Sequence, residues 1–181
     1  ENRYGIRHGA WGGVLDAELR SDGYLRVGVG RIVGALYRTQ EKLVARLPAL
    51  DLFPTENITY LSTQELEDKF PNLTPYEREC AITKEGGTVF LSQIGGKLKS
   101  GKPHDGRAPD YDDWALNGDI LVWNPILERV FEISSMGIRV DPDSLDRQLT
   151  LAGCGDRRAL PHPQMLVEGN MTRPIGGAIG H

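Results

Sequence analysis

Residues 104–140 read HDGRAPDYDDWALNGDILVWNPILERVFEISSMGIRV. Two runs rich in apolar and β-branched residues, 118–123 and 129–140, stand on either side of the dipeptide Asn124-Pro125. Asn-Pro is typical of a turn, and runs of this length and composition are typical of strands. The stretch therefore predicts an antiparallel hairpin, preceded by a loop that is rich in aspartate.

The register of this hairpin follows from the length of its connection. If residues 124–127 form the connection, Trp123 lies opposite Glu128, and counting outward along both strands places Asp119 opposite Glu132. Like charges that face each other across two strands are destabilising, so such a pair titrates abnormally or shares a cation. One or two carboxylates commonly hold Mg²⁺ together with substrate phosphates. We therefore predict a Mg²⁺ site at Asp119 and Glu132.

Arginines flank these acids in the sequence. Arg107 precedes the first strand and Arg139 lies near the end of the second. A guanidinium group matches phosphate oxygens, and a metal ion neutralises the charge that develops on them. A hairpin with one acid on each strand is also typical of a solvated sheet face. The loop aspartates Asp110, Asp112 and Asp113 add to the cluster and favour a functional site.

Length and composition indicate an ordinary globular protein. The 181 residues are enough for one substantial core. With 21 basic and 25 acidic residues the net charge is -4, and no basic run predicts binding to nucleic acid. Cys80 and Cys154 are too few for a disulfide scaffold. No apolar run approaches the roughly 18 residues that cross a bilayer, so we expect no membrane association and a cytoplasmic protein.

Periodicity and capping signals predict the other elements. Residues 31–47 carry apolar residues at helical spacing. Ser62 with Glu65 and Thr74 with Glu77 have the spacing of capping boxes, which open helices. The further expected elements are a strand at 58–61, helices at 62–70 and 75–86, a strand at 88–94 and a helix at 142–152. Residues 1–30 show no clear pattern, so we place the folded domain at residues 31–181.

The last residues, 174–181, are rich in glycine. Gly176 and Gly177 allow the backbone to approach a ligand closely, because glycine has no Cβ. A glycine-rich end that simply frays is the other interpretation.

Four motifs in the chain carry a family resemblance: IGGKL at 94–98, HDGRAPDYDDW at 104–114, LNGDILVWNP at 116–125 and FEISSMGIRVD at 131–141. They closely resemble ammonia-dependent asparagine synthetase, the aspartate-ammonia ligase family, and the resemblance spans residues 36–180. It implies an α+β fold, in which an antiparallel sheet is flanked by helices as in the catalytic domain of class II aminoacyl-tRNA synthetases. It also implies synthesis of asparagine from aspartate, ammonia and ATP, with release of AMP and pyrophosphate.

The resemblance also implies roles for individual residues. The side-chain carboxylate of aspartate would attack the α-phosphorus of ATP, and ammonia would then displace AMP from β-aspartyl-AMP. Arg107 would hold the phosphate or the reacting carboxylate, and Asp112 would hold ammonium and accept its proton. The nucleotide-binding residues that it implies are Asp119, Glu132, Ser135, Arg139, Gly176 and Gly177.

The resemblance is expected to cover only part of the family's chain. Its N-terminal third, with an early helix used in dimerisation, and an arginine near its C-terminus have no counterpart in the motifs found here. The full-length family is expected to form a homodimer. Two alternatives to the ligase are a fragment that only binds nucleotide or is inactive, and a class II ligase with a different acceptor.

Overall fold

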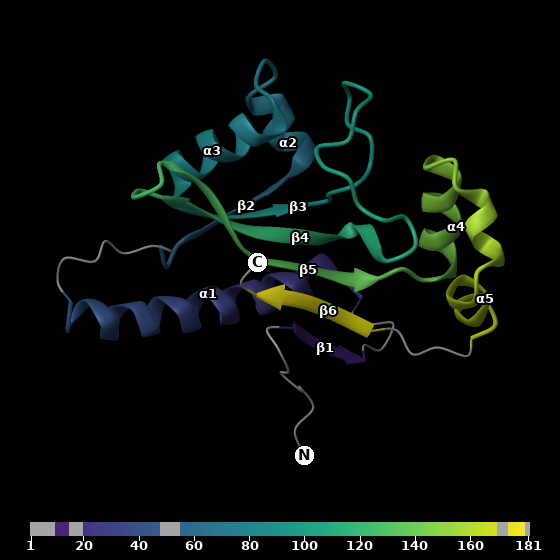
Figure 1. Ribbon diagram of the computed structural model, residues 1–181, viewed down its shortest axis with the longest axis horizontal. Helices are drawn as coiled ribbons and strands as arrows, with labels where there is room; N and C mark the ends of the chain where they lie inside the picture. Colours follow the sequence, from purple (N-terminus) through teal and green to yellow (C-terminus); the bar gives the residue numbers. More distant parts are fainter. Residues whose placement is uncertain (1–9, 15–19, 48–54, 170–173, 180–181) are drawn as a thin grey trace.

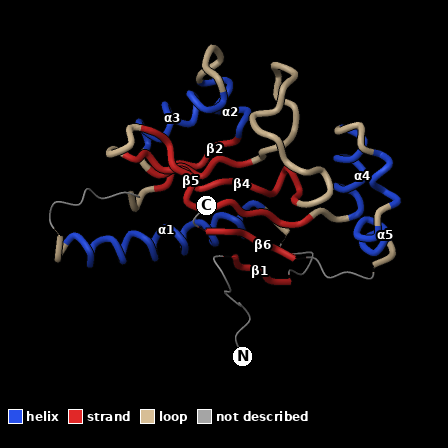
Figure 2. Tube along the Cα trace, viewed as in Figure 1, coloured by secondary structure: helices blue, strands red, loops and turns tan. Residues whose placement is uncertain are grey.

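The computed structural model describes residues 10–14, 20–47, 55–169 and 174–179. In these residues six strands form one sheet, in the order β1-β6-β5-β4-β3-β2 (Figures 1 and 2). The strands are β1 (Ala10–Val14), β2 (Ile58–Ser62), β3 (Thr88–Ser92), β4 (Asp112–Asn124), β5 (Arg129–Arg139) and β6 (Pro174–Ile179). Only β2 and β3 are parallel, and every other pair is antiparallel. The expected antiparallel sheet is confirmed, with one parallel pair at its edge.

Helices lie on both faces of the sheet (Figure 1). They are α1 (Asp22–Val44), α2 (Thr63–Lys69), α3 (Pro75–Gly86), α4 (Pro142–Leu151) and α5 (Pro161–Val167), with a 3₁₀ helix at Gly155–Ala159. On one face α1 contributes Leu25, Val29 and Val33 to a core with β3, β4, β5 and β6. On the other face α2 and α3 pack on β3 and β4 through Leu66 and Ile82. None of the described helices is long and apolar enough to span a membrane.

The capping signals in the sequence operate as expected. Ser62 and Thr74 accept hydrogen bonds from the backbone N–H of Glu65 and Glu77, and each glutamate accepts one in return. An N-cap of this kind is worth about 1 kcal/mol. The first helix differs from the expectation, because it begins at Asp22 rather than at residue 31.

The predicted register of the β4–β5 hairpin is wrong. Trp123 pairs with Val130 rather than with Glu128. The connection has four residues as expected, but they are 125–128 rather than 124–127. The Asn124 side chain caps the turn, because it accepts hydrogen bonds from the N–H groups of residues 126 and 127, both at 3.0 Å. Asn124 therefore ends the strand instead of opening the loop.

A second irregularity lies further along the hairpin. Ile120 of β4 pairs with Ser134, but the next residue, Leu121, pairs with Glu132. Ile133 of β5 therefore has no partner in β4. A bulge of this kind bends the strand and shifts one strand by a residue relative to the other. As a result Asp119 pairs with Ser135, and the predicted direct pairing of Asp119 with Glu132 does not occur.

The glycine-rich segment 174–179 is the strand β6, which lies between β1 and β5. Within these residues the interpretation as a frayed end is wrong. Residues 180 and 181 lie outside the described residues.

Candidate active site

Arg107 and Asp119 form the centre of a polar cluster on the sheet face that carries α2 and α3. Asp119 lies in β4 with 9% of its side chain exposed, and Arg107 comes from the loop before that strand. The Arg107 guanidinium donates from Nη2 to Asp119 Oδ2, and from Nη1 to Asp105 Oδ2 at 2.7 Å. Asp119 Oδ1 is buried and has no hydrogen-bond partner among the described residues. A buried oxygen of this kind favours a site for a ligand or a cation.

Glu132 and Ser135 belong to the same face of the sheet. Ser135 pairs with Asp119, and Glu132 pairs with Leu121, which is two residues from Asp119 in β4. Paired residues share a face, and so do residues two apart in a strand. The two carboxylates therefore share a face as the sequence predicted, although they stand diagonally rather than opposite each other.

Asp112 and Arg139 form an ion pair at the other end of the hairpin. Arg139 also donates to the Tyr111 hydroxyl at 2.7 Å, and its guanidinium carbon lies 3.6 Å from the centre of the Tyr111 ring. The Asp112 carboxylate lies over Gly137 in β5, where a Cβ would come within 2.5 Å of its Cγ. Only glycine at this position leaves room for Asp112.

Burial and ion pairing oppose each other in their effects on these groups. Burial raises the pKa of Asp119 although Arg107 lowers it, and burial raises the pKa of Asp112 although Arg139 lowers it. Burial alone lowers the pKa of Arg107, but the charges of Asp119 and Asp105 raise it overall. Perturbed carboxyl groups that lie together with arginines are typical of functional sites.

The other two loop aspartates are engaged elsewhere. Asp113 is buried in a salt bridge with Arg20, which also reaches Asp141 at 3.0 Å. Asp110 accepts a hydrogen bond from Arg157 at 2.9 Å. Both aspartates therefore connect the loop to neighbouring segments, and of the three only Asp112 joins the cluster.

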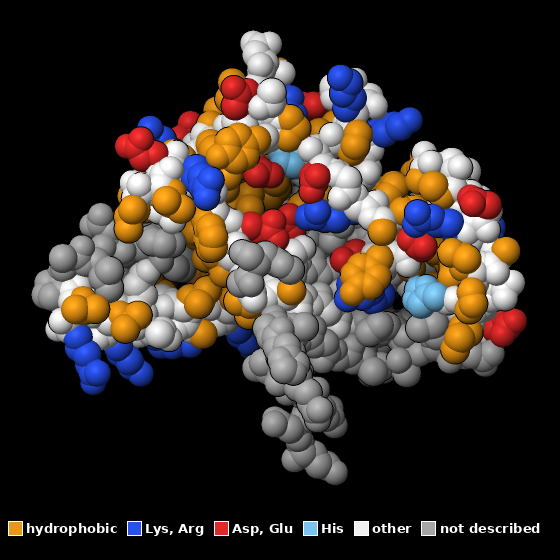
Figure 3. Space-filling view, viewed as in Figure 1, with side chains coloured by type: hydrophobic (Ala, Val, Ile, Leu, Met, Phe, Trp, Pro, Cys, Tyr) orange, Lys and Arg blue, Asp and Glu red, His pale blue; other side chains and the backbone are white. Residues whose placement is uncertain are grey.

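Glycines line the same face beside this cluster. Gly137 of β5 pairs with Gly176 of β6, which in turn pairs with Gly12 of β1. Gly177 belongs to the opposite face and pairs with Met136, which is buried against α1. Figure 3 shows acidic and basic side chains around a hollow near the middle of the view. The row of glycines lets a ligand approach the backbone beside charged groups.

Neither Glu79 nor His104 is among the site residues predicted from the sequence. Glu79 lies on α3, and its charge acts on Asp119. His104 Nε2 lies 2.8 Å from Glu79 Oε1, and the His104 ring is 1% exposed. Glu79 directly follows Arg78, which is buried on the same helix, but no motif marks Glu79 as part of the site. Helix periodicity could have shown that Glu79 faces the sheet, one turn before Ile82 and Thr83.

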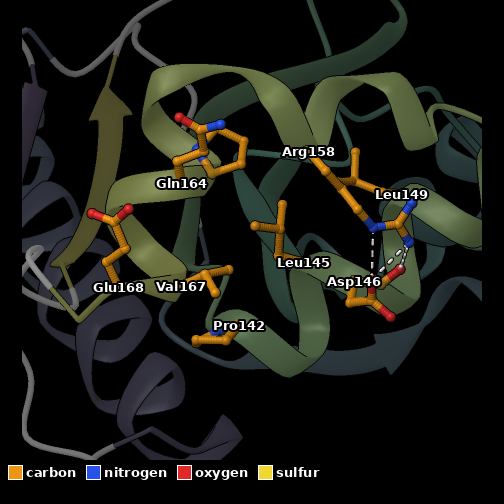
Figure 4. Close-up of a pocket in the computed structure, with 9 residues that line it drawn as sticks. Pro142, Leu145, Asp146, Leu149, Arg158, Gln164, Val167 and Glu168 are labelled. Atoms are coloured by element: carbon orange, nitrogen blue, oxygen red, sulfur yellow. Dashed lines mark hydrogen bonds and ion pairs between the residues drawn. The ribbon is translucent and has the colours of Figure 1, made fainter.

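A groove lies away from this cluster, between α4 and α5 (Figure 4). It has a volume of about 570 Å³. Leu145, Leu149 and Val167 line it, and Arg158 reaches Asp146 at 2.7 Å on its rim. None of the predicted site residues lines this groove, so its size does not make it the active site.

The cluster fits a metal ion only in combination with phosphate. Among the described residues, no group of three or more His, Cys, Asp and Glu side chains is arranged to hold a metal ion. Asp119 and Glu132 supply two carboxylates on one face, and Asp119 Oδ1 has no hydrogen bond to any residue in the described ranges. Mg²⁺ commonly takes one or two carboxylates and completes its coordination with phosphate oxygens and water. The residues present fit that arrangement.

Comparison with solved structures defines the class of fold. Aspartyl-tRNA synthetase from Entamoeba histolytica matches with a TM-score of 0.60 at 12% identity, over 94% of this chain and 38% of that one. Asparaginyl-tRNA synthetase from Pyrococcus horikoshii, complexed with asparaginyl-adenylate, matches with a TM-score of 0.54 at 17% identity, over 94% and 41%. The fold is that of the class II aminoacyl-tRNA synthetases.

The sequence comparisons narrow this class to one family. The family model described as aspartate-ammonia ligase matches residues 8–181. Proteins named aspartate--ammonia ligase are 49% identical in Clostridium perfringens and 50% identical in Fusobacterium nucleatum, each over 94% of this chain. The chain belongs to the aspartate-ammonia ligase family, which confirms the resemblance. It spans about half the length of these relatives, 51% and 52%.

Proposed function

We propose that this chain carries the nucleotide and acyl-transfer site of an aspartate-ammonia ligase. The reaction converts L-aspartate and ammonia to L-asparagine and cleaves ATP to AMP and pyrophosphate. The observation that carries the proposal is the ion pair between Arg107 and Asp119, which lies on a sheet face lined with glycines. Membership of the family supports the substrates.

The first step forms β-aspartyl-AMP. An oxygen of the aspartate side-chain carboxylate attacks the α-phosphorus, and pyrophosphate leaves. The transferring phosphate gains charge as this bond forms, and a fixed guanidinium such as that of Arg107 stabilises the charge without rearranging. Structural neighbours that were solved with an asparaginyl-adenylate support a mixed anhydride on this fold.

Asp119 and Glu132 would hold Mg²⁺, with phosphate oxygens as the other ligands. When bound, the ion neutralises negative charge on the phosphates. Ser135 lies beside Asp119 and is placed to contact the nucleotide. Arg139 and the backbone at Gly176 would complete the nucleotide side, whereas the expected role of Gly177 is not proposed because Gly177 lies on the opposite face.

The second step needs a base. Ammonium must lose a proton before its nitrogen can attack the acyl carbon. Asp112 is the acid that we assign to this proton, since burial raises the pKa of its carboxyl and brings it closer to neutral pH. Arg139, which pairs with Asp112, keeps the carboxylate oriented. The amide forms as the bond between the acyl carbon and the AMP oxygen breaks.

The proposal also covers partners and location. We propose aspartate, ammonia and ATP as substrates, no nucleic acid, a homodimer in the full-length protein and a cytoplasmic location. The net charge of -4 supports the part of the proposal that concerns nucleic acid.

An isotope assay tests the function. Folded chain is incubated with Mg-ATP, aspartate and ¹⁵N-ammonium, and labelled asparagine and AMP are followed together by mass spectrometry. We expect the two products in equal amounts. AMP without asparagine would indicate another acceptor, and binding of Mg-ATP without either product would indicate a domain that only binds nucleotide.

A further inference from the structure

His104 and Glu79 make a buried contact beside the site. His104 Nε2 lies 2.8 Å from Glu79 Oε1, and the ring is 1% exposed. An ionised carboxylate can only accept hydrogen bonds, so Nε2 carries the hydrogen and donates it to Glu79. His104 Nδ1 is buried without a partner among the described residues. The hydrogen bonding of this ring to the described residues therefore rests on Nε2 alone.

The contact ties the loop that carries Arg107 to α3. Arg107 follows His104 by three residues, a span of no more than about 11 Å in extended chain. One turn after Glu79, α3 packs through Ile82 in the same cluster as Leu121 of β4, two residues from Asp119. One helix thus contacts both segments that carry the Arg107–Asp119 pair: the loop of Arg107 at His104, and the strand of Asp119 at Leu121.

Among the described residues, the other contacts that hold the start of this loop to the rest of the protein precede His104 in the chain. Pro103 forms a β-bridge with Lys97, and Ser100 donates to Glu67 at 2.7 Å. Between His104 and Arg107, the Gly106 N–H donates to Asp105 Oδ1 at 2.8 Å, and this contact stays within the loop. His104 is therefore the attachment of the loop to α3 that lies closest to Arg107 in the chain.

We propose that His104 and Glu79 act as a positioning pair, which holds the Arg107 guanidinium over Asp119 for contact with the reacting phosphate. The proposal rests on the proposed function, in which Arg107 contacts the phosphate or carboxylate. Neither His104 nor Glu79 needs to touch substrate.

The test compares His104→Leu with His104→Gln. Leucine removes the donor, whereas the glutamine amide nitrogen stands the same number of bonds from Cβ as Nε2 and can donate to Glu79. Aspartate-dependent exchange of labelled pyrophosphate into ATP gives kcat and KM, and calorimetry gives the Kd for Mg-ATP. We expect His104→Leu to lower the kcat of exchange about tenfold or more and His104→Gln to restore most of it, since small displacements of a positioned group are costly in rate.

A matched control separates positioning from stability. Glu67 is also buried and links side chains at this end of the molecule, since it accepts hydrogen bonds from Arg78 at 3.2 Å and Ser100 at 2.7 Å. Glu67→Gln is expected to lower the melting temperature as His104→Leu does, with kcat unchanged. An equal loss of kcat in Glu67→Gln would overturn the proposal.

A double-mutant cycle with Arg107→Lys tests whether His104 acts through Arg107. Groups that act through each other give non-additive effects, and independent groups add. We expect His104→Leu to cost little further activity in the Arg107→Lys protein. Additive losses, or full exchange in His104→Leu, would contradict a positioning role. If the parent binds Mg-ATP but shows no exchange, the ligase proposal fails, and the same four proteins are compared by their Kd for Mg-ATP. Additive changes in Kd would then contradict the positioning pair separately.

Discussion

Arg107 has acidic partners in two directions, since Asp105 and Asp119 both accept from its guanidinium. Two partners fix the plane of the guanidinium and leave its remaining N–H groups for a ligand. Three carboxyl groups nearby, with the charge of Glu132 included, outnumber this single arginine. A divalent cation would offset the two excess negative charges and allow a polyphosphate to bind beside them.

The metal assignment predicts the behaviour of two conservative variants. Asp119→Asn and Glu132→Gln keep size but remove negative charge, so we expect at least about a tenfold loss in the use of Mg-ATP, which corresponds to ~1.4 kcal/mol. Pyrophosphate release against Mg²⁺ concentration measures this. Normal pyrophosphate release by both variants would remove Asp119 and Glu132 from the metal site.

The raised pKa of Asp119 predicts how stability changes with pH. The Asp119 carboxyl has a higher pKa in the folded protein than in the unfolded chain. Such a group stabilises the fold when the pH is below its pKa in the unfolded chain, and this stabilisation is lost as the pH rises through its pKa in the folded protein. The parent should therefore lose stability relative to Asp119→Asn as pH rises from about 4, the ordinary aspartate range. Thermal unfolding of both proteins over this range checks it, and a difference in melting temperature that does not change with pH would refute it.

Asp112 is predicted to act after adenylation. Asp112→Asn cannot accept a proton, so we expect asparagine formation to slow by about 10²-fold, in the range of general base catalysis. Exchange of pyrophosphate into ATP should stay near the parent rate, because the nucleotide side is intact. Loss of both activities together would place Asp112 in the first step instead.

At the scale of single elements, Gly137 sets the position of Asp112. A Cβ at residue 137 would lie 2.5 Å from Asp112 Cγ, so Gly137→Ala displaces the carboxylate without removing it. Overpacking of this kind costs about 1–3 kcal/mol, and we expect slower asparagine formation with both reacting groups present. Gly96→Ala is the matched control, since a Cβ there meets nothing within 4 Å. Equal activity of the two variants would contradict the role of Gly137.

The elements themselves were largely predictable, because their signals are local. The capping boxes at Ser62 and Thr74 predict where α2 and α3 begin from the spacing of two residues in the sequence. The hairpin was also predictable from Asn124-Pro125. Its register was not, because the side chain of Asn124 extends the strand by a residue and the bulge at Ile133 depends on packing between strands.

The start of α1 shows a signal that was present but overlooked. Ser21 is its N-cap, and Leu25, Val29 and Val33 follow at intervals of four on the buried side. Gly23, Gly28 and Gly30 weaken the helical pattern because glycine is a poor helix former. Burial of Leu25, Val29 and Val33 against the sheet compensates for the low helix propensity of these glycines. Burial depends on the tertiary structure, and the periodicity of the sequence predicts it only in part.

At the scale of the whole molecule, the site depends on strands far apart in the chain. Gly12, Gly137 and Gly176 meet because β6 enters the sheet between β1 and β5. The motifs around Arg107 and Ser135 predicted which residues gather near the hairpin. They did not predict Glu79, because α3 reaches the site through its packing on the sheet, which is a tertiary effect.

The central claim is that aspartate is activated by transfer of AMP to its side-chain carboxylate at this site. Aspartate labelled with ¹⁸O in that carboxylate tests it most directly, with unlabelled Mg-ATP and ammonium. We predict one ¹⁸O atom in each AMP released, because the carboxylate oxygen bonded to the α-phosphorus stays with AMP when ammonia attacks the acyl carbon. Asparagine formed together with unlabelled AMP, or ¹⁸O found in inorganic phosphate, would contradict the account.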